Sequence, residues 1–201
     1  MKKKKSSRPP ARKPGIERYD LVIGAAERLI RDAGSLETLT LQAVSNEARV
    51  PRVSLYYFFP SVEALIDALY QRGIEKLVTA LSKIPEGDDW QTVMELLMDH
   101  TRGFYAKNPV EMILSLSPKS LASVNRANQQ IGRDVYDFLV AQTGLDKSRK
   151  LARACEVATE LADAVWRKSF IEHGKITADY HHHAKTAVIA YLGSAINEQH
   201  S

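Results

Sequence analysis

Apolar residues recur along this chain three and four positions apart, the spacing of a buried helix face, and almost nowhere at the alternating spacing of a strand. The first such stripe consists of Val22, Ala25, Ala26, Leu29 and Ala33. Gly34 follows it at the position where glycine commonly ends a helix. Caps, prolines and glycines divide the rest of the chain in the same way, into about nine helices in all. We therefore predict an all-α fold without a sheet.

Capping residues place two short helices and one long helix after the first. Thr40 caps a short segment, and Pro51 begins a second one after a three-residue connection. Ser61 caps a longer helix that we expect to end near residue 82. Further helices are expected over about 89–107, up to 115, from 117 to Gly144, from a cap at Asp146 to Gly174, and from a cap at Thr177 nearly to the C-terminus.

The composition is typical of a soluble globular protein. The 201 residues are 44% apolar, which is enough for a core, and no run of about 18 apolar residues is present to span a membrane. The N-terminus carries charge without the apolar stretch of a secretory signal, so the cytoplasm is the expected compartment. The single cysteine, Cys155, cannot form an intrachain disulfide and is expected to be a small buried thiol.

Positive charge is concentrated at the N-terminus. Residues 1–18 hold eight basic side chains against one acidic, whereas the remainder holds 20 basic against 23 acidic. A cationic arm of this kind suits a polyanion such as nucleic acid. A solubilising tail or a remnant of an expression tag explains it equally well. Residues 1–15 contain prolines and no apolar period, so we expect disorder in either case.

Two short helices joined by a three-residue turn have the pattern of a helix-turn-helix. The positions expected to face inward carry small or apolar residues: Val44, Ser45, Ala48, Val50 and Leu55. Ala48 has to be small because the two helices cross closely there. The second helix is too short to be stable alone, so its outward side chains are expected to serve a groove of DNA.

The second short helix turns several chemically capable side chains outward. Leu55 and Phe59 lie one turn apart and are expected to face the core. The side chains left pointing away, directly or on the flanks, are Arg52, Val53, Ser54, Tyr56 and Tyr57. An arginine can hold guanine with two hydrogen bonds, a valine methyl can meet a thymine methyl, and hydroxyls can bond phosphate oxygens. The alternative is an aromatic core patch, which we accept for Phe58 and Phe59; four consecutive aromatics cannot all point inward, so at least one tyrosine has to be exposed.

Residues 39–70, LTLQAVSNEARVPRVSLYYFFPSVEALIDALY, resemble the DNA-binding segment of the TetR family of bacterial transcriptional regulators. The match covers about residues 17–70, including AAERLIRDAG at 25–34, and the all-helical remainder fits the effector and dimer domain of that family by layout. The resemblance implies a DNA-binding regulator that responds to a small-molecule effector and binds a palindromic double-stranded operator as a homodimer through its last two helices.

The resemblance also implies roles for individual residues. Thr40 and Gln42 would approach the DNA backbone or groove. The three residues that would read bases are Arg52, Val53 and Ser54, and those that would hold phosphates are Tyr56 and Tyr57. Arg49 departs from the family pattern, because it stands where the turn glycine is usual; it either changes the turn or costs stability while gaining a phosphate contact. Val62 replaces a usual lysine, and the cationic arm is expected to supply that lost charge.

The C-terminal half is where the dimer and the effector site are expected. Small residues in the last two long helices permit close packing, either within the chain or, as we favour, across a four-helix interface with a second copy. Two polar side chains, His100 and Asn128, fall on apolar stripes of the middle helices and would either meet a ligand or be satisfied by neighbours. The candidate effector residues are His100, Phe104, Met112, Asn128, Trp166 and Phe170, although core packing explains the apolar ones equally well.

No pattern in the sequence indicates an enzyme, a metal site or a cofactor. The run His181 to His183 points in directions about 100° apart on a helix and is expected to be a solvated first turn. With the linker candidate at 82–90, the predicted organisation is a disordered arm at 1–15, a helix-turn-helix domain at 16–60, a connecting helix at 61–84 and an effector-binding and dimerisation domain at 85–201. We predict a ligand-responsive repressor; the alternatives are an architectural DNA-binding protein without an effector and a helical small-molecule carrier.

Overall fold

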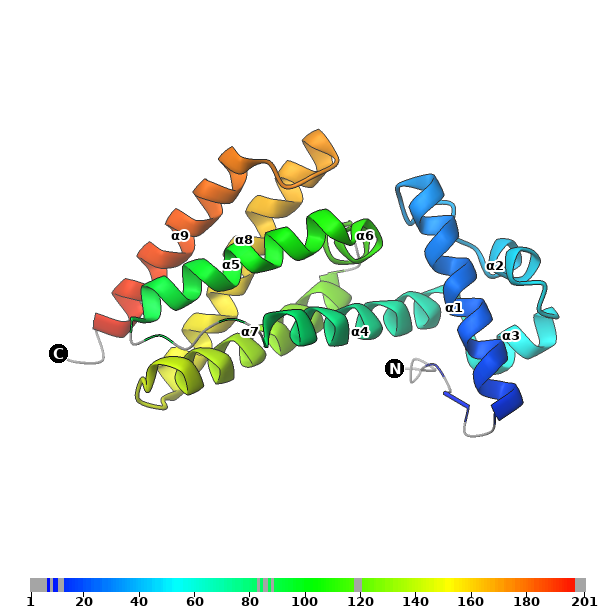
Figure 1. The fold of residues 1–201 in the computed structure, drawn as a ribbon, viewed down its shortest axis with the longest axis horizontal. Helices are drawn as coiled ribbons and strands as arrows, with labels where there is room; N and C mark the ends of the chain where they lie inside the picture. Colours follow the sequence, from blue (N-terminus) through cyan, green and yellow to red (C-terminus); the bar gives the residue numbers. More distant parts are fainter. Residues whose placement is uncertain are drawn as a thin grey trace. The chain divides into compact units, whose positions relative to one another are not determined.

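The computed structural model describes residues 7, 9–10, 13–82, 84, 87, 89–117 and 121–197; of the side chains at 121–128 it gives no account. Within these ranges the chain forms helices and no strand, which confirms the predicted all-α fold (Figure 1). The described helices are α1 (Lys13–Ala33), α2 (Leu41–Ala48), α3 (Arg52–Phe58), α4 (Val62–Leu81), α5 (Trp90–Lys107), α6 (Pro109–Leu116), α7 (Leu121–Thr143), α8 (Arg149–His173) and α9 (Ala178–Asn197).

The chain divides into two compact units. The first unit is Met1–Val78 with Asn108–Ser115, and the second is Thr79–Lys107 with Leu116–Ser201. The sequence placed the boundary near residue 85 and assigned α6 to the C-terminal domain, whereas nearly all of α6 lies in the first unit. The functional roles given to the ranges 16–60, 61–84 and 85–201 stay predictions.

The helix α1 differs from its prediction at its start and on its buried face. Most of the predicted arm lies outside the described residues, but Lys13, Pro14 and Gly15 already belong to α1. Its buried residues are Val22, Ile23, Ala25, Ala26 and Ile30. The predicted stripe was therefore wrong at Leu29, which is half-buried, and at Ala33, which is exposed. Turning Ile23 and Ile30 inward buries more apolar area than turning Ala33 inward would.

Several helix ends follow the predicted caps, and the start of α8 does not. Gly34 and Gly174 both adopt left-handed conformations, at φ +65° and +67°, and donate their N–H groups to Ile30 and Phe170 at 2.9 and 2.8 Å. The predicted cap of α8 at Asp146 was wrong: Ser148 is the cap, and its Oγ accepts the N–H of Leu151 at 3.0 Å. A serine two residues later makes a capping bond of the same kind, and the sequence pattern does not separate the two positions.

The second unit is held by four long helices. In it α8 packs against both α7 and α9, and α5 packs against α7 and α9 (Figure 1). Gly132 on α7 permits the close approach to α8, because a Cβ there would lie 2.6 Å from the Cα of Glu156. The same added atom at Gly103 on α5 would meet nothing within 4 Å.

Gly132 should therefore tolerate no side chain. Gly132→Ala is expected to lower the free energy of unfolding by about 1–3 kcal/mol, because α7 and α8 must move apart to admit the methyl group. Gly103→Ala is the matched control; it should leave stability unchanged or raise it by about 0.5–1 kcal/mol, since alanine favours a helix. Urea denaturation of the two variants measures both values, and equal stabilities would contradict this role of Gly132.

Candidate nucleic-acid interface

The first short helix, α2, begins at the predicted cap. Thr40 is extended, at φ −127° and ψ 152°, and its Oγ1 accepts the N–H of Ala43 at 3.1 Å. Ala48 is buried where α2 ends, in agreement with the small residue expected at the crossing. Arg28 on α1 holds α2 from outside through its Nε, which lies 2.8 Å from Oε1 of Glu47, although both side chains are about half exposed. The orientation of α2 therefore comes mainly from its buried face.

The turn between α2 and α3 passes through Arg49. This residue is left-handed, at φ 53° and ψ 36°, and is the one non-glycine residue with positive φ in the described ranges. Its N–H donates to Asn46 at 3.2 Å, and that of Val50 donates to Ser45 at 3.2 Å. The buried Oγ of Ser45 donates back to the carbonyl of Val50 at 2.8 Å. Arg49 thus adopts the left-handed backbone conformation in which glycine is usual.

Three buried side chains anchor α3. Leu55, Phe58 and Phe59 are at most 4% exposed. Tyr19 of α1 contacts both phenylalanine rings, with ring centroids 5.8 Å from Phe58 and 5.0 Å from Phe59. Two details of the prediction were wrong: Pro51 is the cap before the helix and not its first residue, and Phe59 follows the helix in extended conformation.

The opposite face of α3 is open to solvent. Val53 is 84% exposed, Tyr57 62% and Tyr56 54%, and Arg52 is also exposed. Ser54 is half-buried. The aromatic core patch therefore accounts for Phe58 and Phe59 and fails for both tyrosines. A valine exposed to this extent contributes nothing to the core, so this face is available to a partner.

The other candidate residues lie at the starts of α2 and α4. Thr40 and Gln42 are exposed on α2, and Nε2 of Gln42 donates to Oδ1 of Asn46 at 2.8 Å. Val62, which replaces the usual lysine, is half-buried at the start of α4, after Ser61 has capped that helix. The eight residues predicted to contact DNA are thus exposed or half-buried, with none in the core.

The helix α6 joins the first unit through a buried carboxylate. Glu111 is 7% exposed, and its Oε1 lies 2.6 Å from Nζ of Lys76 on α4. The same Nζ lies 3.3 Å from Oε1 of Glu27 on α1. Burial alone would lower the pKa of Lys76, but the two carboxylates outweigh it and raise the pKa. One ammonium group therefore ties α1, α4 and α6 together.

The predicted effector residues are divided between the two units, and the effector pocket stays a prediction. Met112 is buried in α6 and falls in the first unit, whereas Trp166, Phe104 and Phe170 fall in the second. Of these three, Trp166 is buried and the two phenylalanines are half-buried. His100 is exposed, and its Nδ1 lies 2.9 Å from the carbonyl oxygen of Leu96, so its predicted place on an apolar face was wrong. The side chain of Asn128 lies outside the described residues.

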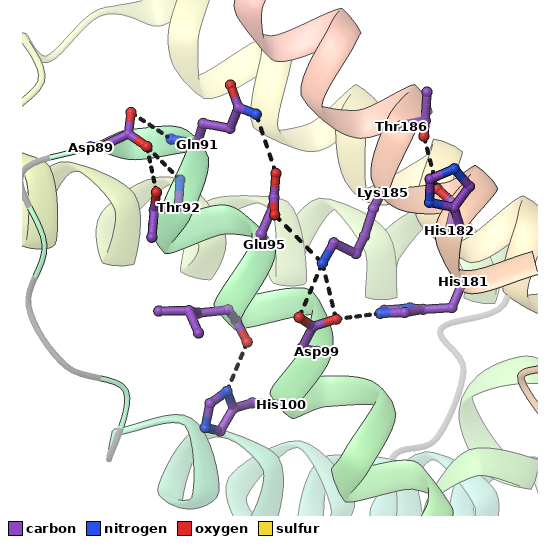
Figure 2. A network of polar contacts seen from close by, with 11 residues as sticks. Asp89, Gln91, Thr92, Glu95, Asp99, His100, His181, His182, Lys185 and Thr186 are labelled. Carbon is purple, nitrogen blue, oxygen red and sulfur yellow. Dashed lines mark hydrogen bonds and ion pairs between the residues drawn. The ribbon is translucent and has the colours of Figure 1, made fainter. Parts of the chain in front are cut away.

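A polar cluster in the second unit was missed. His181 is buried, and its Nε2 lies 2.6 Å from Oδ1 of Asp99 on α5. Lys185, one turn further along α9, reaches both oxygens of Asp99 at 3.2 and 3.0 Å (Figure 2). The prediction of a solvated turn was therefore wrong for His181 and right for His182 and His183. The signal lay in the spacing, because the buried residues of α9 are His181, Ala184, Val188, Leu192 and Ile196.

The cluster fixes the charge states of its members. Burial lowers the pKa of His181, and the nearby cations Arg102 and Lys185 add to this effect against the opposing effect of Asp99. Burial would raise the pKa of Asp99, but hydrogen bonds from His181 and Lys185 outweigh it and lower the pKa. Asp99 is therefore an anion that accepts from a neutral imidazole and from an ammonium group.

Other side chains offer little chemistry. Cys155 is buried, as expected, and burial raises the pKa of its thiol to about 12, which leaves it protonated and unreactive. In the part of the chain that the structure describes, no three His, Cys, Asp or Glu side chains are grouped to hold a metal ion. The helices described there include none with the length and apolar character needed to cross a membrane.

Comparisons with known proteins show which fold this arrangement of helices resembles. No family model matches the chain. A crystal structure of a TetR-family transcriptional regulator from Streptomyces coelicolor superposes with a TM-score of 0.71 and 22% identity, over 89% of this chain and 99% of that one. The chain has the fold of the TetR-family regulators.

Curated sequence relatives are named as HTH-type transcriptional regulators. An HTH-type transcriptional repressor of Mycobacterium tuberculosis (strain H37Rv) is 25% identical over 162 residues, which are 77% of this chain and 60% of that protein. An uncharacterized HTH-type transcriptional regulator of Mycobacterium bovis gives the same values. The chain thus spans about 60% of the length of these curated relatives.

Relief of the left-handed turn should stabilise this TetR-like fold. Arg49→Gly is expected to raise the free energy of unfolding by about 0.5–1 kcal/mol, because about 1–2 kcal/mol of left-handed strain exceeds the entropic cost of a glycine. Arg49→Ala keeps a Cβ in the same conformation and should leave stability nearly unchanged. Urea denaturation measures both, and a loss of stability in Arg49→Gly would show that the side chain itself holds the turn.

Acid should weaken the TetR-like fold partly through His181. Its folded pKa lies below the unfolded value of about 6.5, so the stability contributed by the neutral ring is present above that pH and is lost as the pH falls through the folded pKa. Asp99, whose pKa is also lowered, acts in the same direction at lower pH. Unfolding free energies measured between about pH 7 and pH 5 should fall less steeply for His181→Gln than for the unaltered chain. His182→Gln is the control, and a profile for His181→Gln as steep as that of the control would refute the assignment.

Proposed function

We propose that the chain is a non-enzymatic, ligand-responsive transcriptional repressor that binds a palindromic DNA operator as a homodimer through α2 and α3. The observation that carries the proposal is the two-sided character of α3. Leu55 and Phe58 fix the helix from within, while Val53, Tyr56 and Tyr57 project from it into solvent. A helix presented in this way matches the width of the major groove.

The outward side chains suit DNA in different ways. Arg52 carries the planar guanidinium that can hold the N7 and O6 acceptors of guanine, and Val53 offers methyl groups to thymine. The hydroxyl group of Ser54 can bond a base edge, and those of Tyr56 and Tyr57 suit phosphate oxygens. Base preference is thus assigned to Arg52 and Val53 with Ser54, and positioning to the two tyrosines.

The helix α2 would supply further backbone contacts. Thr40 and Gln42 are exposed at its start, where the free N–H groups of a helix favour a phosphate. Arg49 is exposed in the turn before α3. A positive charge there would repay the strained backbone conformation by neutralising a phosphate, and its contribution should fall as salt is added.

A homodimer through α8 and α9 suits the palindromic operator. Part of the small and apolar face of these helices packs within the chain, since Ala154, Ala158, Val188 and Leu192 are buried. Another part remains outside: Ile171 on α8 is 63% exposed. An apolar side chain left in solvent on one of the two predicted interface helices favours a second copy as its partner.

The response to a ligand would pass through α6. This helix follows α5 directly in the chain, and Glu111 joins it to Lys76 of α4. A ligand that displaces α5 would pull α6 and, through this ion pair, α4. The distance between the two recognition helices of a dimer would then no longer match half-sites about one helical turn apart.

Selection of bound sequences from a random duplex library tests the proposal. A ligand-responsive repressor should enrich a palindrome, and a metabolite should release it. An architectural DNA-binding protein would bind without an enriched motif, and a small-molecule carrier would bind no duplex. Either of these two results would overturn the proposed function.

Arg52→Ala should relax the base preference at one position of each half-site and weaken specific binding by about 1–3 kcal/mol, because one bidentate contact to a base is lost. Arg31→Ala, which removes an exposed arginine from the last turn of α1, is the matched control and should leave the motif unaltered. Sequencing of the enriched pools reports both results. If Arg52→Ala selects the same motif as the control, Arg52 does not read bases.

A further inference from the structure

Two unpartnered polar atoms belong to neighbouring rings in the second unit. Three buried side-chain atoms in the described ranges lack a hydrogen-bond partner, namely Gln142 Oε1, Trp166 Nε1 and His181 Nδ1. Trp166 is 6% exposed and His181 is 5% exposed. Their rings stack, with centroids 5.7 Å and planes 27° apart. Buried polar atoms are nearly always paired, so two unpaired atoms on two stacked rings call for a physical explanation.

We infer that Trp166 Nε1 and His181 Nδ1 form the polar end of a ligand site in the second unit, for a small uncharged molecule that carries a hydroxyl group on an aromatic body. The inference deepens the proposed function by giving the chemical class of the effector. It rests on that function only for the consequence on DNA, because ligand binding itself is measured on the free protein.

The chemistry of the two atoms selects the hydroxyl group. The indole Nε1 of Trp166 carries a hydrogen and can only donate. The carboxylate of Asp99 accepts from Nε2 of His181 at 2.6 Å, so the neutral imidazole presents a bare lone pair at Nδ1 and can only accept. A hydroxyl oxygen accepts from one atom and donates to the other. A carboxylate has no proton for Nδ1, and an ammonium group has no lone pair for the indole.

The cluster around Asp99 holds this arrangement in place. Figure 2 shows Lys185 and His181 of α9 both directed at Asp99 of α5. Glu95, one turn earlier on α5, also faces Lys185, and its Oε2 lies 3.6 Å from the Nζ of Lys185. Lys185 keeps Asp99 charged, and Asp99 keeps the proton of His181 on Nε2. The acceptor at Nδ1 is therefore fixed before a ligand arrives, which reduces the free-energy cost of binding.

The surroundings of the two atoms favour an aromatic body. Tyr105 of α5 is buried and presents its ring edge-on to Trp166, at 6.3 Å and 89°. Phe104 adjoins Tyr105 at 5.9 Å between ring centroids. Aromatic rings pack well against one another in edge-on and offset arrangements. The ammonium group of Lys185 is already paired with Asp99 and Glu95.

Phenol, toluene and benzoate are the probes. The chain has two tryptophans, so a ¹⁵N–¹H spectrum of the full-length protein contains two indole signals, which Trp90→Phe assigns. Phenol should shift the Trp166 signal downfield and saturably, because its oxygen accepts from the indole N–H, and should leave the Trp90 signal unmoved. Phenol should bind about tenfold more tightly than toluene, the change expected from one or two net hydrogen bonds. Benzoate should bind more weakly than phenol.

Two substitutions distinguish hydrogen bonding at this site from nonspecific aromatic packing of the probes. Trp166→Phe keeps an aromatic ring without the N–H, and His181→Gln keeps an amide donor for Asp99 without the ring acceptor. Each removes one of the two hydrogen bonds and should therefore reduce the preference for phenol over toluene, as calorimetry measures, whereas Trp90→Phe should keep the full preference for phenol. Circular dichroism checks that each variant is folded.

The inference is overturned if the Trp166 signal does not respond to phenol, which would mean that water alone serves the two atoms, or if both variants keep the preference. Failure of the proposed function is a separate result, since it would leave phenol binding intact and show no enriched operator.

Discussion

The placement of α3 depends on a small aromatic contact with α1. A helix of seven residues is unstable alone, so its position has to come from tertiary packing. Phe58 and Phe59 supply that packing against Tyr19, together with the fully buried Leu55. Burial of side chains of this size contributes about 1.5–3 kcal/mol each, far more than the propensity of one helical turn. The exposure of Val53 on the opposite face follows directly, because the anchored face leaves the helix no other orientation.

The turn at Arg49 sets the angle between α3 and α2. The hydrogen bonds between Ser45 and Val50 close this turn from the inside, and one of them involves a buried hydroxyl group that would be costly to leave unpaired. The left-handed backbone of Arg49 is then a consequence of a turn that is held at both ends. Strain of this kind persists where the surrounding structure determines the conformation, and such positions are concentrated at functional sites.

The sequence predicted best those features that depend on local chemistry. The caps at Thr40, Gly34 and Gly174 depend on one or two hydrogen bonds with near neighbours, and each lies where the pattern indicated. The outward face of α3 was predictable because Leu55 is apolar and the tyrosines cannot all be buried. The buried face of α1 was not: Leu29 and Ile30 are adjacent and both apolar, so periodicity alone leaves an ambiguity of one residue.

Two histidines in the second unit show where prediction from local sequence patterns fails. His100 and His181 each stand in register with apolar residues, at positions that a pattern treats alike. The structure buries only His181, because Asp99 and Trp166, which lie on two other helices, give its ring a hydrogen bond and a stacking partner. His100 meets a carbonyl of its own helix and stays at the surface. A polar group enters the core only where tertiary neighbours repay its desolvation, and those neighbours are distant in sequence.

The ion pairs centred on Lys76 and on Lys185 differ in what their loss would leave behind. If Lys76 moved away, Glu111 would remain as a buried carboxylate without its cation, a state that costs more than the loss of an exposed pair. If Lys185 moved away, Asp99 would remain about half exposed and still bonded to His181. The ion pair between α4 and α6 therefore favours movement of the two helices as one body. The contacts between α5 and α9 can instead be lost one at a time. A link that moves α4 and α6 together is the kind of element that the proposed coupling between ligand and DNA would require.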